Sequence, residues 1–331
     1  MTNPFVFIVG CPRSGTTLLQ RMMDAHPQVA VIPEIGWLAS RYEKREGLTP
    51  EGLVAPALVD KLFEERTFGR YGALPVSREE LRDLLACGHP ISYAELISLL
   101  FDRYGAARGK DLVACKSAGL TPKVRTLHEL WRRAKFIHLI RDGRDVCLSA
   151  IGWRKAEKLA SRFPSWREDP VSTAAAWWEW HVQPALEAGR SLGPQLYYEV
   201  RYESLVVHAA DELAGLCAFL GIPYENAMLR FHEDRAQREA TADAKHAWLP
   251  PTPGLRDWRS QMPREDVERF EAVAGDLLDE LAYPRGAGHL TEERLEYASR
   301  IRRSFEAAMQ AASAEPAREA EQLAADASSR S

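Results

Sequence analysis

An apolar run, FVFIV over residues 5–9, leads into the loop GCPRSGTT over residues 10–17 and then into the helix-like segment LLQRMM over residues 18–23. The loop contains two glycines five positions apart, Gly10 and Gly15. A strand, such a loop and a helix together direct backbone N–H groups and the positive end of a helix dipole toward one anion. The stretch therefore predicts an anion-binding loop at the first strand of an α/β fold.

The loop differs from that of nucleoside triphosphatases at one position. There the residue after the second glycine is a lysine that reaches the β- and γ-phosphates. Here that residue is Thr16, and the basic side chain of the loop is Arg13. The sequence therefore predicts a phosphate-bearing ligand other than a nucleoside triphosphate. A turn that only connects a strand to a helix is the alternative.

A second motif, KFIHLIRDGRDVCLS over residues 135–149, is typical of a buried strand that enters a helix. In magnesium-dependent nucleotide hydrolases a strand of this kind ends in an aspartate that helps to hold the metal. The first residue after this strand is Arg141, which suits an anion better than a metal. Two alternatives remain open: Arg141 and Asp142 form a surface ion pair of little energetic weight, or Asp142 is a metal ligand.

A third strand-like run, DLVAC over residues 111–115, brings Lys116 and Ser117 to its end. Open parallel sheets bind ligands beyond the carboxyl ends of their strands. Three such ends place Arg13, Lys116 and Arg141 around one cleft. Together these side chains predict a site for a bisphosphate.

These motifs resemble a known family. The segment PRSGTTLL over residues 12–19, the segment DAHP over residues 24–27 and the later Glu34 are similar to the sulfotransferases that use 3′-phosphoadenosine 5′-phosphosulfate (PAPS), especially the branch that includes tyrosylprotein sulfotransferases. The resemblance covers most of residues 5–285 in order. It is most specific at residues 12–19 and 141–149.

The resemblance implies a set of donor-binding residues. It implies that Arg13, Ser14, Gly15, Thr16 and Thr17 hold the 5′-phosphosulfate. It also implies that Arg141 and Ser149 bind the 3′-phosphate, that Tyr202 lies near the cofactor, and that Arg259 or Arg256 closes over the 3′-phosphate.

The resemblance also implies a reaction, the in-line transfer of a sulfuryl group to an acceptor hydroxyl. Arg13 and Lys116 supply the cations that such a transfer needs, and no metal is expected. Glu34 matches the glutamate that acts as base in tyrosylprotein sulfotransferases, although the usual double glutamate is Pro33-Glu34 here. Glu34 as a helix-start residue, and His26 or His89 as the base, are the alternatives.

The predicted fold is a P-loop-like three-layer α/β/α arrangement with a central parallel sheet. A mostly helical layer over about residues 36–108 is inserted between strands, and Ser77 with Glu80 forms a capping-box pattern within it. We expect a sulfotransferase domain over residues 1–288. Residues 289–331 are expected to form a C-terminal helix, followed by a disordered tail after Ser313.

Composition limits the remaining options. A chain of 331 residues with 46% hydrophobic content can bury a sizeable core, and a net charge of -4 argues against a general nucleic-acid binder. The cysteines are odd in number and widely spaced, which favours reduced core residues: Cys11, Cys87, Cys115, Cys147 and Cys217. No signal peptide or bilayer-length apolar run is evident, so a cytoplasmic protein is expected.

Two other functions stay open, a phosphoryl-transfer enzyme with an unusual phosphate loop and a non-catalytic nucleotide-binding module. The acceptor is open as well, since a carbohydrate, lipid, natural product or peptide hydroxyl is compatible with the sequence. The oligomeric state is not predicted.

Overall fold

The computed structural model describes residues 5–64, 76–86, 90–153, 156–233 and 250–328. The chain divides into two compact units, one of residues 1–141 with 181–255 and one of residues 142–180 with 256–331. Each unit is described by itself below.

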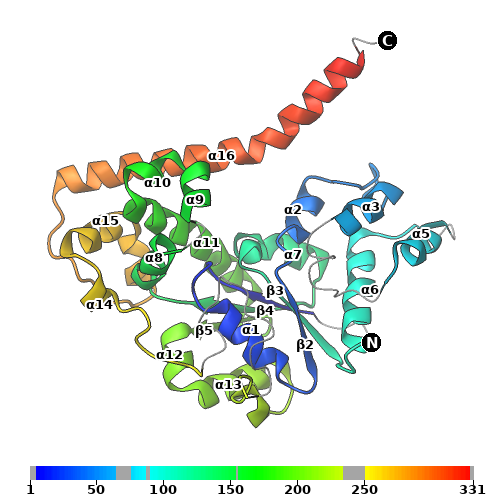
Figure 1. Ribbon diagram of the computed structural model, residues 1–331, viewed down its shortest axis with the longest axis horizontal. Coiled ribbons are helices and arrows are strands. Elements are labelled where there is room, and N and C mark those ends of the chain that lie inside the picture. Colours follow the sequence, from blue (N-terminus) through cyan, green and yellow to red (C-terminus); the bar gives the residue numbers. More distant parts are fainter. Residues whose placement is uncertain (1–4, 65–75, 87–89, 154–155, 234–249, 329–331) are drawn as a thin grey trace. The chain divides into compact units, whose positions relative to one another are not determined.

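The first unit is built on a parallel sheet (Figure 1). Its strands are β1 (Val6–Val9), β2 (Val29–Pro33), β3 (Leu112–Lys116), β4 (Lys135–Ile140) and β5 (Tyr197–Arg201). They lie in the order β2-β3-β1-β4-β5, and every neighbouring pair is parallel. Because β1 has β3 on one side and β4 on the other, the carboxyl end of β1 is the point at which such sheets bind ligands.

Alternate residues of β1 enter different cores. Phe5, Phe7 and Val9 belong to one buried cluster, whereas Val6 and Ile8 belong to another on the opposite face. The first face is covered by helices that include α2 (Leu38–Glu43), α3 (Pro56–Glu64), α6 (Tyr93–Ala106) and α7 (Val124–Leu130), and the second by α1 (Thr16–Asp24), α12 (Tyr202–Val207) and α13 (Ala209–Leu220). The predicted three-layer α/β/α fold is confirmed.

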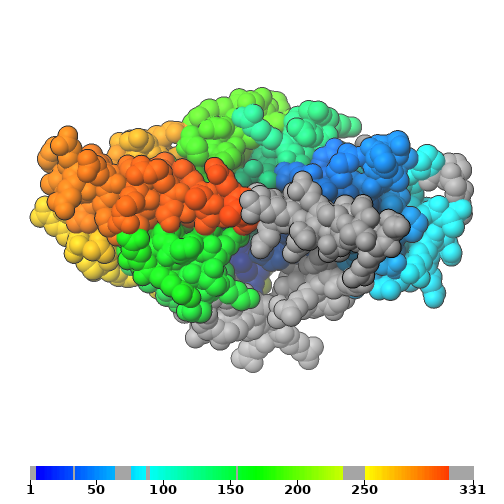
Figure 2. Space-filling view, turned by 90° about the horizontal axis from the view of Figure 1, so that it is seen from above, coloured from blue at the N-terminus to red at the C-terminus, as the bar shows by residue number. Residues whose placement is uncertain are grey.

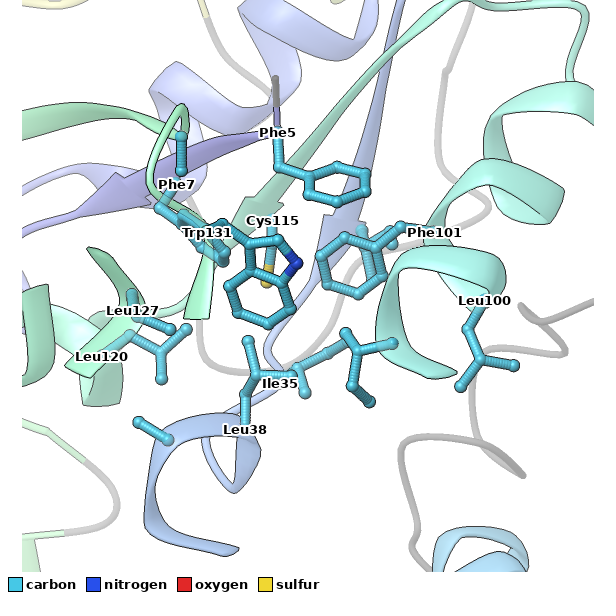
Figure 3. Close-up of a cluster of buried hydrophobic side chains, with 14 of the residues drawn as sticks. Phe5, Phe7, Ile35, Leu38, Leu100, Phe101, Cys115, Leu120, Leu127 and Trp131 are labelled. Carbon is cyan, nitrogen blue, oxygen red and sulfur yellow. The ribbon is translucent and has the colours of Figure 1, made fainter. Parts of the chain in front are cut away.

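Aromatic rings pack together on the face of the sheet that is covered by α2, α3, α6 and α7 (Figure 3). The ring of Phe5 meets Phe101 of α6 edge-on at 5.3 Å, and Trp131 lies 5.5 Å from Phe7. The indole N–H of Trp131 donates to Ser98 Oγ of α6 at 3.0 Å, so this buried polar atom is paired. These contacts attach the inserted helices to the sheet from which the site is built.

The inserted layer is helical, as predicted, and contains α2, α3, α5 (Arg78–Ala86) and α6. The predicted capping box is confirmed, because Glu80 N donates to Ser77 Oγ at 3.0 Å and Ser77 N donates to the Glu80 carboxylate at 2.6 Å. Ser92 and Glu95 form a second capping box at the start of α6, which the sequence analysis did not identify.

The second unit is helical. It contains α8 (Gly143–Ile151), α9 (Ala156–Arg162), α10 (Pro164–Glu168), the first half of α11 (Pro170–Leu192), α14 (Trp258–Gln261), α15 (Arg264–Glu280) and α16 (Glu292–Ser328). Figure 2 shows α16, in orange, along α9 and α10, in green. Phe305 of α16 lies 4.8 Å from Phe163, and Arg300 pairs with Glu168 at 2.6 Å.

A buried cation organises the second unit. The side chain of Arg144 is 0% exposed and donates to Asp142 Oδ2 at 2.8 Å and to Glu271 Oε1 at 2.6 Å. Its guanidinium also lies 3.5 Å from the ring of Trp258. Asp142 additionally caps α8 by accepting from Arg144 N at 3.0 Å. Asp142 is therefore a structural anion that pairs with Arg144, which the sequence analysis did not predict.

The described cysteines are free and buried: Cys11, Cys115, Cys147 and Cys217. Burial raises the pKa of Cys115 to about 12 and that of Cys217 to about 11, so both stay as thiols at neutral pH. Cys87 lies outside the described residues.

The helix α16 continues to Ser328, further than the end that the sequence predicted near Ser313. The predicted division into residues 1–288 and 289–331 stays a prediction.

Replacing Arg144 with methionine should destabilise the protein by about 3–5 kcal/mol, because Asp142 and Glu271 then stay buried without their cation. Equilibrium denaturation in urea measures this loss. The matched control is Arg264→Met, which removes an exposed arginine from a 3.1 Å pair with Glu268 and should cost less than about 0.5 kcal/mol. Equal effects of the two substitutions would contradict a structural role for the Arg144 cluster.

Candidate active site

Every strand of the sheet ends beside a residue that the sequence analysis selected. The loop from Gly10 follows β1, Glu34 follows β2, Lys116 ends β3, Arg141 follows β4 and Tyr202 follows β5. In a parallel sheet these carboxyl ends lie at one edge. The fold therefore brings the predicted residues of the first unit to the same edge of the sheet.

The loop after β1 is held in an uncommon conformation. Arg13 has a φ of 77°, in the left-handed region that side-chain-bearing residues rarely adopt, and Gly15 has a φ of 98°. The turn is closed by Ser14 N, which donates to Cys11 O at 3.0 Å, and by Gly10 N, which donates to Thr121 Oγ1 at 2.8 Å. Helix α1 then begins at Thr16, so the N–H groups of its first turn face the loop.

Tyr202 supports both the loop and Arg141. A Cβ on Gly15 would lie 2.5 Å from the Tyr202 ring, so only glycine permits this approach. The guanidinium of Arg141 lies 4.2 Å from the centroid of the same ring, and Nη1 of Arg141 donates to Arg13 O at 3.4 Å. The sequence placed Tyr202 near the donor by resemblance. Its role as a platform between Gly15 and Arg141 comes from the tertiary structure alone.

Lys116 and Glu34 form an ion pair. Lys116 Nζ donates to Glu34 Oε1, and the backbone N–H of Glu34 donates to Lys116 O at 2.7 Å. The Lys116 side chain is only 3% exposed, whereas that of Glu34 is 52% exposed. Like Arg13, Glu34 has a positive φ, of 38°. The candidate base and a candidate cation are thus already in contact, which sequence reasoning did not foresee.

Two buried hydroxyls at this edge have no hydrogen-bond partner among the described residues. They are Ser14 Oγ in the loop and Ser117 Oγ after β3, on residues that are 0% and 1% exposed. Buried hydroxyls are usually paired with protein groups or ordered water, so each of these two is available to hydrogen-bond a bound molecule. The sequence analysis selected Ser14 but gave Ser117 no role.

His26 is a structural residue. It is fully buried, its Nδ1 accepts from Gln28 N at 3.0 Å, and its Nε2 donates to Pro223 O at 2.8 Å. Both ring nitrogens are used within the protein, so the alternative that His26 is the base is wrong. His89, the other histidine considered, lies outside the described residues.

The second unit contains Ser149 and both arginines considered for closure over the 3′-phosphate, Arg256 and Arg259. Ser149 is buried on α8, and the Arg259 side chain, 59% exposed, lies 4.7 Å from the ring of Trp258. Their predicted contacts with a 3′-phosphate stay predictions.

Neither a metal centre nor a membrane span is evident in the part of the chain that the structure describes. No group of three or more His, Cys, Asp and Glu side chains is placed to hold a metal ion there. Within the same ranges, no helix has both the length and the apolar character that crossing a membrane requires.

A parallel sheet with a lysine-free loop after β1, and with Lys116 and Arg141 at the ends of β3 and β4, is typical of an α/β enzyme that binds a phosphate-bearing donor. Residues 4–226 match a family profile described as "Sulfotransferase family". The chain belongs to the sulfotransferase family. The prediction of a PAPS-dependent sulfotransferase is confirmed.

Several relatives carry a more specific name. Protein-tyrosine sulfotransferase A of Caenorhabditis elegans is 27% identical over 300 residues, which cover 86% of this chain and 69% of that protein. Human protein-tyrosine sulfotransferase 1 is 27% identical over 296 residues, which cover 85% of this chain and 70% of the human protein. The protein-tyrosine sulfotransferase of Drosophila melanogaster is also 27% identical, and the match spans only 52% of its length.

Among solved structures, the fold is similar to the sulfotransferase domain from the Synechococcus PCC 7002 olefin synthase. The TM-score is 0.56 at 23% identity, and the match covers 86% of this chain and 97% of that domain. This likeness supports the α/β fold.

Gly15→Ala should abolish binding of adenosine 3′,5′-bisphosphate, measured by calorimetric titration, because the new methyl group collides with Tyr202. Gly193→Ala is the matched control, since Gly193 also has a positive φ, of 73°, but a methyl group there would meet no atom within 4 Å. The control should lose about 1 kcal/mol of stability from backbone strain and keep its affinity. Retained binding in Gly15→Ala would show that the Gly15–Tyr202 contact does not shape the donor site.

Proposed function

We propose that Glu34 is the general base of this sulfotransferase, that Arg13 and Lys116 stabilise charge at the transferred group, and that the acceptor is a hydroxyl compound. The observation that carries this proposal is the ion pair of Glu34 with the buried Lys116. The pair lies at the ends of β2 and β3, and β3 is the neighbour of the strand that precedes the phosphate loop.

The residues of the loop suit the 5′-phosphosulfate of PAPS. Arg13 supplies a charge, Ser14 a buried hydroxyl without a partner among the described residues, and Gly15, Thr16 and Thr17 supply backbone N–H groups at the start of α1. Arg141, which lies against Tyr202, would bind the 3′-phosphate. When bound, PAPS supplies the sulfuryl group and the leaving phosphate.

Lys116 and Glu34 are coupled through their charges. The buried ammonium of Lys116 is neutralised by the Glu34 carboxylate, which an incoming anion would displace. A Glu34 carboxylate released in this way can accept the proton of the acceptor hydroxyl. A carboxylate is a stronger base when it is shielded from water. Because Glu34 is 52% exposed, the bound substrates must provide that shielding.

The acceptor we propose to test first is a tyrosine phenol, since the relatives at 27% identity are named protein-tyrosine sulfotransferases. Pro33 in place of the first glutamate of the family motif leaves carbohydrate, lipid and natural-product hydroxyls as further candidates. We also propose that the basic side chains replace a metal in this reaction, and that the protein acts in the cytoplasm.

Arg13→Ala and Arg141→Ala should each weaken binding of adenosine 3′,5′-bisphosphate by about tenfold or more, because each loses charge-assisted hydrogen bonds. Calorimetric titration with and without magnesium measures this, and the wild type should bind the bisphosphate equally in both conditions. Arg264→Ala, which removes an exposed arginine of α15, is the control and should bind normally. Tighter, magnesium-dependent binding of ATP would favour the phosphoryl-transfer alternative instead.

Glu34→Gln should lower turnover with PAPS and a tyrosine-containing peptide by about 100-fold or more, since the base is lost. Its affinity for adenosine 3′,5′-bisphosphate should not fall, because the carboxylate that neutralises Lys116 is gone. Glu43→Gln is the matched control, as Glu43 pairs with Lys123 at 2.7 Å and is also partly exposed. Unchanged turnover in Glu34→Gln would eliminate Glu34 as the base, and an absence of turnover in the wild type would favour a non-catalytic module.

A further inference from the structure

Ser117 is a serine whose hydroxyl has no partner among the described residues. It occupies the N-cap position of the short helix η1 (Ala118–Lys123) but makes no side-chain cap hydrogen bond. A serine at this position usually accepts from a backbone N–H of the first turn. The backbone N–H of Ser117 is tied to β1, since it donates to Ile8 O at 3.2 Å, so the residue is fixed in place while its Oγ stays buried and unsatisfied.

Two exposed glycines flank this hydroxyl. A Cβ on Gly36 would lie 3.9 Å from Ser117 Oγ, and a Cβ on Gly119 would lie 3.8 Å from the same atom and 3.7 Å from Gly36 Cα. These are ordinary van der Waals distances, so alanine fits at both positions. Neither glycine has a positive φ, and Gly119 lies in η1, where alanine is the more favourable residue. Neither backbone conformation nor packing explains these glycines.

Glycines of this kind leave bare backbone that a ligand can approach closely. The phosphate loop, Arg141 and Tyr202 lie at the ends of β1, β4 and β5, and Lys116, proposed to contact the transferred group, ends β3. Gly36 follows β2, and Ser117 and Gly119 come after Lys116. In the sheet order β2-β3-β1-β4-β5, these last three residues lie on the side of β1 away from β4 and β5. They lie on the same side as Glu34, and a base must face the acceptor.

We infer that Ser117, Gly36 and Gly119 form the contact surface for the acceptor, with the Ser117 hydroxyl donating to or accepting from its oxygen-bearing group. This inference rests on the proposed function. Because Gly36 and Gly119 carry no side chains, a planar phenol ring can approach the backbone closely there. Ser117 is thus a positioning residue for the acceptor.

The test uses the protein with PAPS and two phenols, p-nitrophenol and a peptide with a single tyrosine. Ser117→Ala removes the proposed hydrogen bond, and Gly119→Ala adds a methyl group to the contact surface. Each should therefore raise the KM for the phenol by about fivefold and change kcat less. Both should bind adenosine 3′,5′-bisphosphate like the wild type. Gly288→Ala is the control, because Gly288 is exposed, lacks a positive φ, and a methyl group there would meet nothing within 4 Å.

A further readout separates function from folding. The melting temperature of Gly119→Ala should be no lower than that of the wild type, because alanine suits η1 better than glycine. An unchanged KM in both variants, or weaker bisphosphate binding by Ser117→Ala, would overturn the inference. A wild type that binds the bisphosphate but transfers to neither phenol would also overturn it and leave the donor site intact, whereas a wild type that binds no bisphosphate would sink the proposed function itself.

Discussion

The parallel pairing of β1 with β3 on one side and with β4 on the other is the constraint on which the site depends. This pairing brings the carboxyl ends of the strands to one edge of the sheet and places the phosphate loop between the strand ends that carry Lys116 and Arg141. The two apolar faces of β1, seen in the alternation of Phe7 and Ile8 between the two cores, fix the sheet between its helical layers. A one-residue shift of β1 would exchange the side chains on its two faces, so the alternation specifies its register.

Strain is concentrated where chemistry is proposed. Among the described residues, the non-glycine residues with positive φ are Arg13, Glu34, Arg45 and Ala282, and two of these four are candidate catalytic residues. Such conformations cost on the order of 1–3 kcal/mol each and persist only when the surroundings impose them. Here the surroundings are Thr121 at Gly10, and the backbone hydrogen bond from Glu34 to Lys116.

Two buried cations illustrate different uses of charge. Arg144 is enclosed by Asp142 and Glu271 and lies on Trp258, so its charge serves the packing of the second unit. Lys116 is nearly as inaccessible, but its partner Glu34 is half exposed, and we propose that a bound anion replaces it. A buried charge with one exposed partner is suited to bind a ligand, because exchange of partners keeps it neutralised.

The sequence by itself determined the fold class, the phosphate loop and the strand ends, because strand periodicity, glycine spacing and capping patterns such as Ser77 with Glu80 are local properties. It also identified Arg13, Lys116, Glu34 and Arg141 as residues at those ends. Only the tertiary structure decided that Lys116 pairs with Glu34, that Tyr202 supports Gly15, and that His26 is structural. These facts depend on contacts between residues far apart in the chain, such as Gly15 and Tyr202. No local sequence pattern indicates that two such residues are close in space.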